Sequence, residues 1–477
     1  MFTTFDIKNT KYDSDTIQRF SDYDEYRNLY DGDFNKAFSS TVLKIRKRYP
    51  LDNTTAQSLI NINLFWALTD FFKGFLTNQG ITVNVDDEVQ ANWDEIAKNN
   101  NFISVLKEVY IDNSRFGNGI FKVALDNSKA KIFSICPDCW IPVFKNGNLN
   151  EIEGHILLYP LETFVDGVKK EYKKVEKHKK GYVENEIWEC KNGVFSRLLD
   201  EEEMALFNVN KIDDFSDIWN DFIVFPTKNS TESDKYFGES DYKRCKSLVE
   251  EIMLTISQNS KIINRHANPK MSGSEQNLEF DPTTGTRILP DTDFLKVGTD
   301  GVKPEYITAD LQADAIQKHI DTLLKFFYIL TKTPPQAYGL DISGTMSGES
   351  LRKIFIAALA KVDDIKQVSF TSTIQNVVKC AMAFNSTPTE NVNIAWGEPI
   401  PNDYSEMVNI ENSRVTAGTQ SKLTTIMTLD NVSEADAKTE LERISMENSN
   451  QNISKTTETK TDTNEDKNID EKTDSNS

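Results

Sequence analysis

The sequence contains little of what most enzymes use. Its 477 residues include five cysteines and four histidines, too few and too scattered for a disulfide framework or an evident zinc site. It contains no G-x-x-x-x-G-K-[ST] segment to hold ATP phosphates and no G-x-S-x-G segment around a nucleophilic serine. We therefore expect neither a nucleotide-driven motor nor a serine hydrolase, and we assign no catalytic residue, no cofactor and no metal.

A long apolar run is also missing. The most hydrophobic window, Leu64–Leu76, is too short to cross a bilayer and is interrupted by Asp70 and Lys73. The first ten residues show no basic segment followed by an apolar one, so we expect no secretory signal and no membrane partner. The odd number of cysteines favours reduced thiols, and we expect a multidomain protein made inside the cell.

Basic charge is scarce. The chain has 54 Lys and Arg against 74 Asp and Glu, which gives a formal net charge of −20. Binding DNA through its phosphates needs Lys and Arg, so a tight grip on DNA is not expected. This balance suits a protein that tolerates nucleic acid close by without holding it.

The spacing of apolar residues predicts an α+β protein. Helical periodicity dominates up to residue 116. Between about residues 117 and 225, short strands separated by turn residues are expected at 120–124, 131–135, 155–159, 182–189 and 222–225. Long helices are expected over 240–266, 310–330 and 349–384, and shorter ones over 404–416, 420–428 and 433–446. Residues 447–477 have almost no apolar content, and we expect them to stay disordered.

Several local patterns occur along this series of elements. They are Asn63-Leu-Phe-Trp-Ala-Leu-Thr-Asp-Phe-Phe-Lys-Gly74, Tyr236-Phe-Gly-Glu-Ser240, Thr333-Pro-Pro-Gln-Ala-Tyr-Gly339, Ser347-Gly-Glu-Ser-Leu351, Trp396-Gly-Glu-Pro-Ile-Pro-Asn-Asp403 and Ala417-Gly-Thr-Gln-Ser421. In their order and spacing, the chain from about residue 23 to 447 resembles the portal proteins of tailed bacteriophages with long noncontractile tails. Each pattern alone is weak, and the series as a whole carries the resemblance.

The resemblance implies a portal fold assembled as a ring, usually of twelve subunits. Its parts would be an α/β wing (1–235), stem helix 1 (236–266), an α/β clip (267–308), stem helix 2 (309–331), a tunnel loop (332–348), a long kinked spine helix with a return strand (349–400), a helical crown (401–446) and a polar tail (447–477).

The function implied is a conduit for double-stranded DNA during packaging and ejection, located in the virion at one capsid vertex. The implied partners are further copies of the chain, the passing DNA, the terminase large subunit, the head–tail adaptor, and the major capsid and scaffolding proteins. Assembly would take place in the cytoplasm of the host bacterium.

Two groups of residues are candidates for facing DNA. Glycine permits unusual dihedral angles and proline restricts bending, so a loop rich in both suits a segment that changes shape as DNA passes. The loop candidates are Pro334, Pro335, Tyr338, Gly339, Asp341, Gly344, Ser347 and Gly348. The stem candidates are the acidic Glu250, Glu251, Asp314 and Asp321, which would repel the DNA backbone, and Lys261 and Lys325, which would guide it.

Other interpretations remain open from the sequence. Cys136-Pro-Asp-Cys139 has redox spacing, but it runs into Trp140-Ile-Pro142, and we expect a turn between strands. The first alternative function is a different structural virion subunit. The second is a metal-dependent nucleic-acid enzyme, which a carboxylate cluster and cleavage activity would reveal.

Overall fold

The computed structural model describes part of the chain, in two units. The described residues are 14–38, 60–78, 80–165, 168–191, 194–233, 235–267, 270–272, 279–283, 285–288, 305–307, 313–341, 348–400, 404–430, 432 and 436–446. One unit comprises Met1–Gly344 with Lys353–Pro399, and the other comprises Thr345–Arg352 with Ile400–Ser477. Among the described helices, none has the length and apolarity that crossing a membrane requires.

The core of the first unit is built on helices from the N-terminal part of the chain. They are α1 (Ser14–Asp31), α2 (Phe34–Ala37), α4 (Leu64–Thr77), α5 (Gln90–Asn99) and α6 (Phe102–Phe116). On α4, Phe65, Leu68 and Phe72 are fully buried, as expected for residues repeating every three to four positions. The side chain of Asn63 caps this helix by accepting a hydrogen bond from the Trp66 amide.

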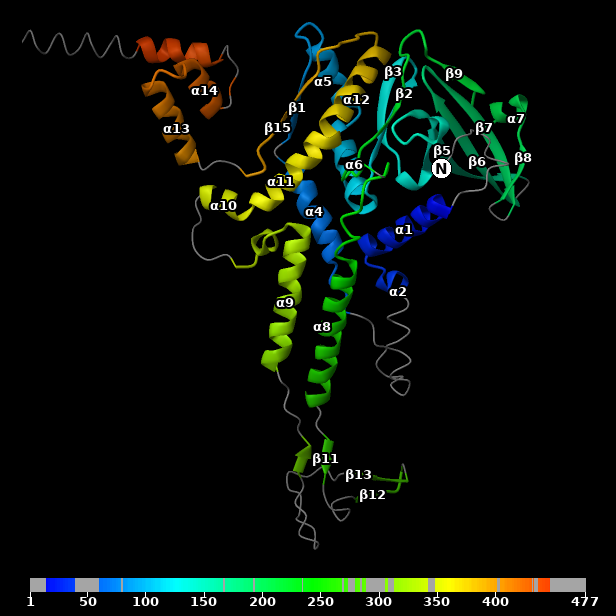
Figure 1. The fold of residues 1–477 in the computed structure, drawn as a ribbon, viewed down its shortest axis with the longest axis vertical. Helices are drawn as coiled ribbons and strands as arrows, with labels where there is room; N and C mark the ends of the chain where they lie inside the picture. The colour runs from blue at the N-terminus through cyan, green and yellow to red at the C-terminus, as the bar shows by residue number, and fades with distance from the viewer. Residues whose placement is uncertain are drawn as a thin grey trace, which may run out of the picture. The chain divides into compact units, whose positions relative to one another are not determined.

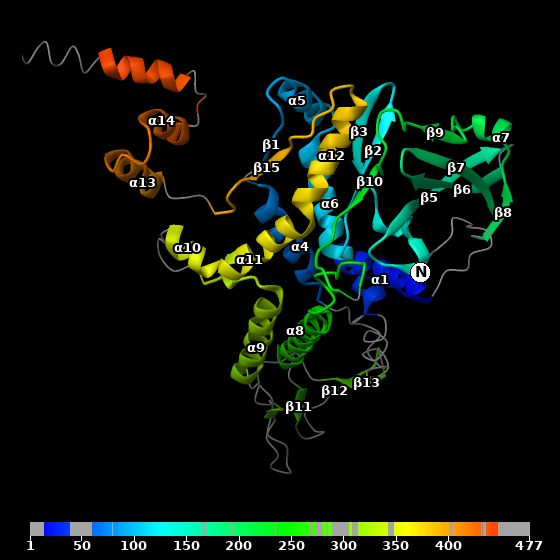
Figure 2. The same cartoon turned by 45° about the horizontal axis from the view of Figure 1, so that its top comes forward.

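Antiparallel sheets occupy the middle of the chain, as the expected α+β class requires (Figures 1 and 2). One has the order β10-β2-β3, from Val224–Pro226, Ile120–Asp126 and Lys129–Ser134, and α6 and α12 pack on it. The other runs β4-β5-β6-β7-β8, with β9 beside β7. Its strands are Trp140–Phe144, Ile152–Val165, Val168–Lys179, Tyr182–Lys191, Val194–Leu198 and Ile212–Asp214, and α7 is Glu201–Ala205.

Two long helices then lie side by side and run in opposite directions (Figures 1 and 2). They are α8 (Lys246–Ala267) and α9 (Ala313–Thr331). In the sequence between these helices, β11 (Lys270–Ser272) pairs with β14 (Glu305–Ile307), and β12 (Glu279–Asp281) pairs with β13 (Thr286–Ile288). The two expected helices are confirmed, but α8 begins six residues later than predicted.

The expected kinked helix is confirmed, and its kink has a position. Helix α10 (Gly348–Ile354) is followed by Phe355, whose φ of −88° and ψ of 7° are not helical, and α11 (Ile356–Ile365) begins after it. A π-helical turn at Lys366–Phe370 leads into α12 (Thr371–Phe384). Strand β15 (Asn393–Trp396) then returns to pair with β1 (Ile81–Asn84).

The second unit is helical where it is described. Helices α13 (Tyr404–Thr416) and α14 (Lys422–Asp430) pack together, and residues 436–446 are also helical. These match the three terminal helices that the sequence predicts, within a few residues at each end. The buried carboxylate of Glu411 on α13 accepts a hydrogen bond from Gln420, in the turn before α14, and one from Thr425 Oγ1 on α14 at 3.5 Å.

Candidate functional site

The loop between α9 and α10 is the first candidate site. Pro334 and Pro335 start a 3₁₀ turn, Pro335–Tyr338, that ends at Gly339 in the left-handed conformation with φ of 75°. Asp341 also has a positive φ, 53°, and is exposed. Gly344 and Ser347 lie outside the described residues, and Gly348 is the first residue of α10.

Tyr338 points back into the protein rather than away from it. Its ring centroid lies 6.2 Å from that of Phe327 and 6.0 Å from that of Tyr328, both on α9. Its hydroxyl donates to Thr333 Oγ1 at 3.3 Å, and burial raises the pKa of Tyr338 to about 12. Tyr338 therefore anchors the first part of the loop, while the exposed Asp341 is the better placed of the two for a transient contact. That either residue meets DNA stays a prediction.

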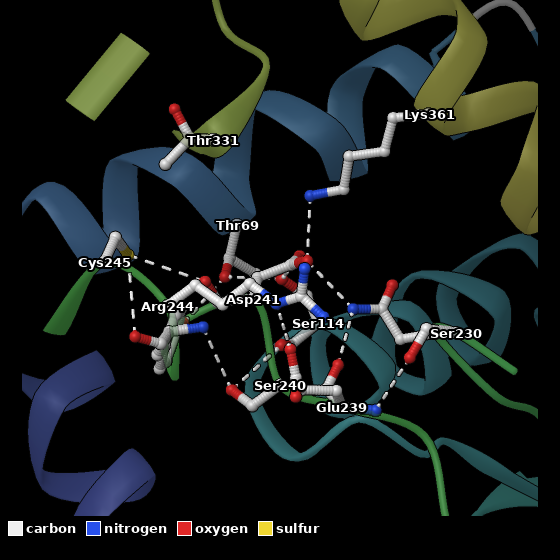
Figure 3. A network of polar contacts seen from close by, with 12 residues as sticks. Thr69, Ser114, Ser230, Glu239, Ser240, Asp241, Arg244, Cys245, Thr331 and Lys361 are labelled. Atoms are coloured by element: carbon white, nitrogen blue, oxygen red, sulfur yellow. Dashed lines mark hydrogen bonds and ion pairs between the residues drawn. The ribbon is translucent and has the colours of Figure 1, made fainter. Parts of the chain in front are cut away.

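The second candidate site is a polar network at the base of α8, drawn in Figure 3. The carboxylate of Asp241 accepts hydrogen bonds from Ser114 Oγ at 2.7 Å, Asn229 Nδ2 at 2.8 Å and Lys361 Nζ at 2.8 Å. The side chains of Lys361 and Asp241 are only 15% and 7% exposed. One carboxylate thus joins α6, the chain just before α8, and α11.

Close backbone contact supports this junction. Gly117 has φ of 86°, and a Cβ built on it would lie 2.3 Å from the carbonyl oxygen of Gly238. Ser240 Oγ donates to the Arg115 carbonyl at 2.6 Å, which fixes the turn before α8. These bonds explain why α8 starts at Lys246 and not at residue 240. The segment around Gly238 stood out in the sequence, but nothing there pointed to its contact with Gly117, which lies 121 positions earlier.

The predicted channel-lining residues lie on α8 and α9. Glu251, Asp314, Asp321 and Lys325 are exposed, and Glu250 is half-buried. Asp321 accepts a hydrogen bond from Gln317 Nε2 at 2.8 Å. The side chain of Lys261 lies outside the described part of the structure. The structure brings these residues onto one helical pair, and their orientation toward a lumen stays a prediction.

Helix α9 also carries an exposed apolar stripe that the sequence analysis did not single out. Phe326, Ile329 and Leu330 are 53%, 69% and 49% exposed. They are spaced three and four residues apart and so share one side of the helix. The neighbouring Phe327 is fully buried, and α9 packs on α8. The sequence does carry a signal for this stripe, because apolar residues occur on more than one side of the helix.

The Cys136–Cys139 segment is the predicted turn between strands. It forms a 3₁₀ turn at Pro137–Cys139 between β3 and β4. Burial, reinforced by nearby carboxylates, raises the pKa of both thiols to about 12. A redox pair needs a lowered thiol pKa, so this environment opposes that chemistry. Within the described ranges, no three His, Cys, Asp or Glu side chains are grouped as a metal site would need.

A buried charged cluster lies where the two sheets meet. Glu176 on β6 receives Lys122 from β2, and it accepts a hydrogen bond from His178 Nε2 at 2.9 Å. His155 faces His178 across β5 and β6 and accepts a hydrogen bond from Trp140 Nε1 at 3.0 Å. Burial lowers the pKa of both histidines, and that of His155 falls to about 3. Because the charged and polar groups of this cluster pair with one another, the cluster has a structural role.

Most of the chain is similar to one family of known proteins. The model of the family described as "Phage portal protein, SPP1 Gp6-like" matches residues 9–454. A search of curated proteins finds no match.

Similar solved structures come from gene transfer agent (GTA) particles. A chain from the "Neck of empty GTA particle computed with C6 symmetry" is 9% identical with a TM-score of 0.44, covering 77% of this chain and 89% of that one. One from the "Virion of native gene transfer agent (GTA) particle" is 9% identical with a TM-score of 0.43, covering 81% and 93%. One from the "Neck of native GTA particle computed with C12 symmetry" is 10% identical with a TM-score of 0.44, covering 80% and 93%.

Proposed function

This chain belongs to the phage portal protein family, SPP1 Gp6-like, and from that premise we propose that it forms a ring of twelve subunits through which double-stranded DNA enters and leaves the capsid. The ring sits at one vertex of the virion and serves as a connector between head and tail. The family match over residues 9–454 is the observation that carries the proposal.

The charge of the chain supports passage of DNA rather than binding. Each phosphate neutralised by a fixed cation adds affinity that has to be broken before DNA slides. The exposed carboxylates of Glu251, Asp314 and Asp321 lie on the helical pair α8–α9, where they weaken such contacts. Lys325 supplies a scattered positive charge that guides the duplex without holding it.

The apolar stripe of α9 supports self-association. Phe326, Ile329 and Leu330 form a patch of exposed apolar side chains, and such patches mark protein–protein contact sites when they are large enough. A ring needs a contact that repeats head to tail between identical copies, and a stripe on one side of a long helix suits one half of such a contact. We assign the stripe to the interface between neighbouring subunits.

The remaining regions take the roles expected of the family. The strand pairs within 267–308 form the clip, which docks the terminase large subunit during packaging and the head–tail adaptor afterwards. The loop 332–348 borders the channel, and the wing and crown meet the capsid and scaffolding proteins. The role is structural, with no turnover of nucleic acid or nucleotide.

A pair of variants tests the self-association, and a nuclease assay tests the enzymatic alternative. Ile329→Asp places a charge in the stripe and should convert the ring-sized species to subunits, as measured by light scattering. Leu206→Asp changes a residue that is 82% exposed after α7 and should leave the mass unchanged. Equal masses for the wild type and Ile329→Asp would contradict the assigned interface. Cleavage of DNA that depends on a divalent metal, and is lost with one carboxylate, would favour the enzymatic alternative.

A further inference from the structure

Two aromatic side chains of α4, Phe71 and Phe75, contact residues on either side of the chain segment that lies outside the first unit: Phe71 contacts both sides, and Phe75 contacts the later one. The chain leaves the first unit after Gly344 and returns to it at Lys353. Tyr338 is the last anchored aromatic residue before that departure, and Phe355, at the kink between α10 and α11, is the first one after the return. Both contact the ring of Phe71.

The geometry of these contacts is specific. The ring centroid of Phe71 lies 6.4 Å from that of Tyr338 and 6.1 Å from that of Phe355. Phe75, one turn further along α4, lies 4.7 Å from Phe71 and 5.5 Å from Phe355, and its ring is tilted 27° from that of Phe355. These separations fall in the range of favourable aromatic pairs. Phe71 therefore touches both ends of the segment, whereas the ring contact of Phe75 is with the returning end.

We propose that Phe71 and Phe75 form an aromatic clasp that holds Tyr338, at the end of the 3₁₀ turn, and Phe355, at the start of α11, on one helix, and that Phe71 couples the opening of these two points. The turn at Tyr338 and the kink at Phe355 then open together, because both depend on the ring of Phe71. The clasp exists in a single chain; a role for it in DNA passage rests on the proposed function.

A polar contact fixes the same helix independently of the rings. Lys361 lies six residues after Phe355 on α11, and its ammonium group reaches Asp241 and lies 4.0 Å from the ring centroid of Phe72. Phe72 is fully buried, while Phe71 and Phe75 are only half-buried. Truncating Phe71 or Phe75 therefore leaves the core of α4 in place.

Backbone amides at each end report on the clasp. The amide of Leu340 donates to the Pro335 carbonyl at 3.2 Å, close to Tyr338, and the amide of Leu359 donates to the Phe355 carbonyl at 2.8 Å. Hydrogen exchange at these two amides measures how often each end opens. The experiment uses the full purified chain in whatever assembly it adopts.

Phe71→Ala removes a ring contact from both ends, and we expect exchange at Leu340 and Leu359 to accelerate together by about three- to tenfold. Phe75→Ala is the matched variant, and it should accelerate Leu359 alone. Acceleration of only one amide in Phe71→Ala, or an equal acceleration in both variants at both amides, would overturn the clasp. If Phe71→Ala proves insoluble, Phe71→Leu with the same readout replaces it. Because neither amide depends on ring formation, failure of this test is distinct from failure of the proposed function.

Discussion

The Lys361–Asp241 contact allows a quantitative prediction for the junction between α8 and α11. In Lys361→Met, the apolar stem of the side chain is kept while the charge is removed. Asp241 then loses one donor but keeps Ser114 and Asn229, at 2.7 and 2.8 Å. Breaking a buried ion pair costs about 3–5 kcal/mol when a charge is left unpaired, and the two remaining donors reduce this to about 2–3 kcal/mol.

The measurement is the thermal unfolding midpoint, read by calorimetry. For a cooperative unit of roughly 400 residues, a loss of this size lowers the midpoint by about 3 °C. The control is Lys379→Met, because Lys379 pairs with Glu390, whose side chain is 92% exposed. That change should cost less than about 1 kcal/mol.

A double variant isolates the pair itself. In a chain that already carries Asp241→Asn, adding Lys361→Met should cost less than about 1 kcal/mol, because the charge interaction has already been lost. The reasoning is refuted if Lys361→Met shifts the midpoint no more than Lys379→Met does. It is equally refuted if the Lys361→Met loss is the same with Asp241 and with Asn at that position.

Two further predictions concern the N-terminal half of the chain. The folded-state pKa of His155, about 3, lies below its usual value of about 6.5. Its stabilising contribution is therefore complete above about pH 6.5 and falls by about 2–3 kcal/mol at pH 4.5, and His155→Gln should flatten the pH dependence of the urea midpoint between those values. Gly117→Ala should abolish soluble protein, because its Cβ would overlap the backbone of Gly238. Gly147→Ala is the control: no atom lies within 4 Å of its Cβ, so the change should cost only about 1 kcal/mol of stability. Expression level and thermal denaturation measure the two effects.

The long helices were predictable because their apolar residues repeat in sequence. On α8, Val249, Ile252 and Met253 are buried at the spacing of one helical face. The start of α8 was missed, because residues before it bond to Ser114 and Arg115, which are distant in sequence. The spacing of apolar residues indicates that a segment is helical, but it does not show which distant residues determine where the helix begins.

Strand β6 shows why part of the sheet was not predicted. Its apolar Tyr172 and Val175 are three residues apart, a spacing that does not alternate. Glu176 and Lys177 are charged and yet buried. Each has an ion-pair partner: Lys122 pairs with Glu176, and Glu186 pairs with Lys177. Alternation of polar and apolar residues fails as a signal when ion pairs replace apolar contacts on a covered face.

The candidate site was only partly visible in the sequence. The Pro and Gly residues around Tyr338 indicated a loop at that place, and the structure has one. The anchoring of Tyr338 by rings of α4 and α9, and the contact of Lys361 with Asp241, join residues up to 267 positions apart. No local pattern marks such pairs, so they emerge only from the packed structure.

The most direct test of the portal account is electron microscopy of the purified, untagged chain, with its mass measured in solution. The account predicts class averages of a closed ring of about twelve subunits with an axial hole that admits a DNA duplex. An open lattice or a helical tube would contradict it and point to another structural subunit of the virion. A monomer or dimer that persists at high concentration and with scaffolding protein added would contradict the ring itself.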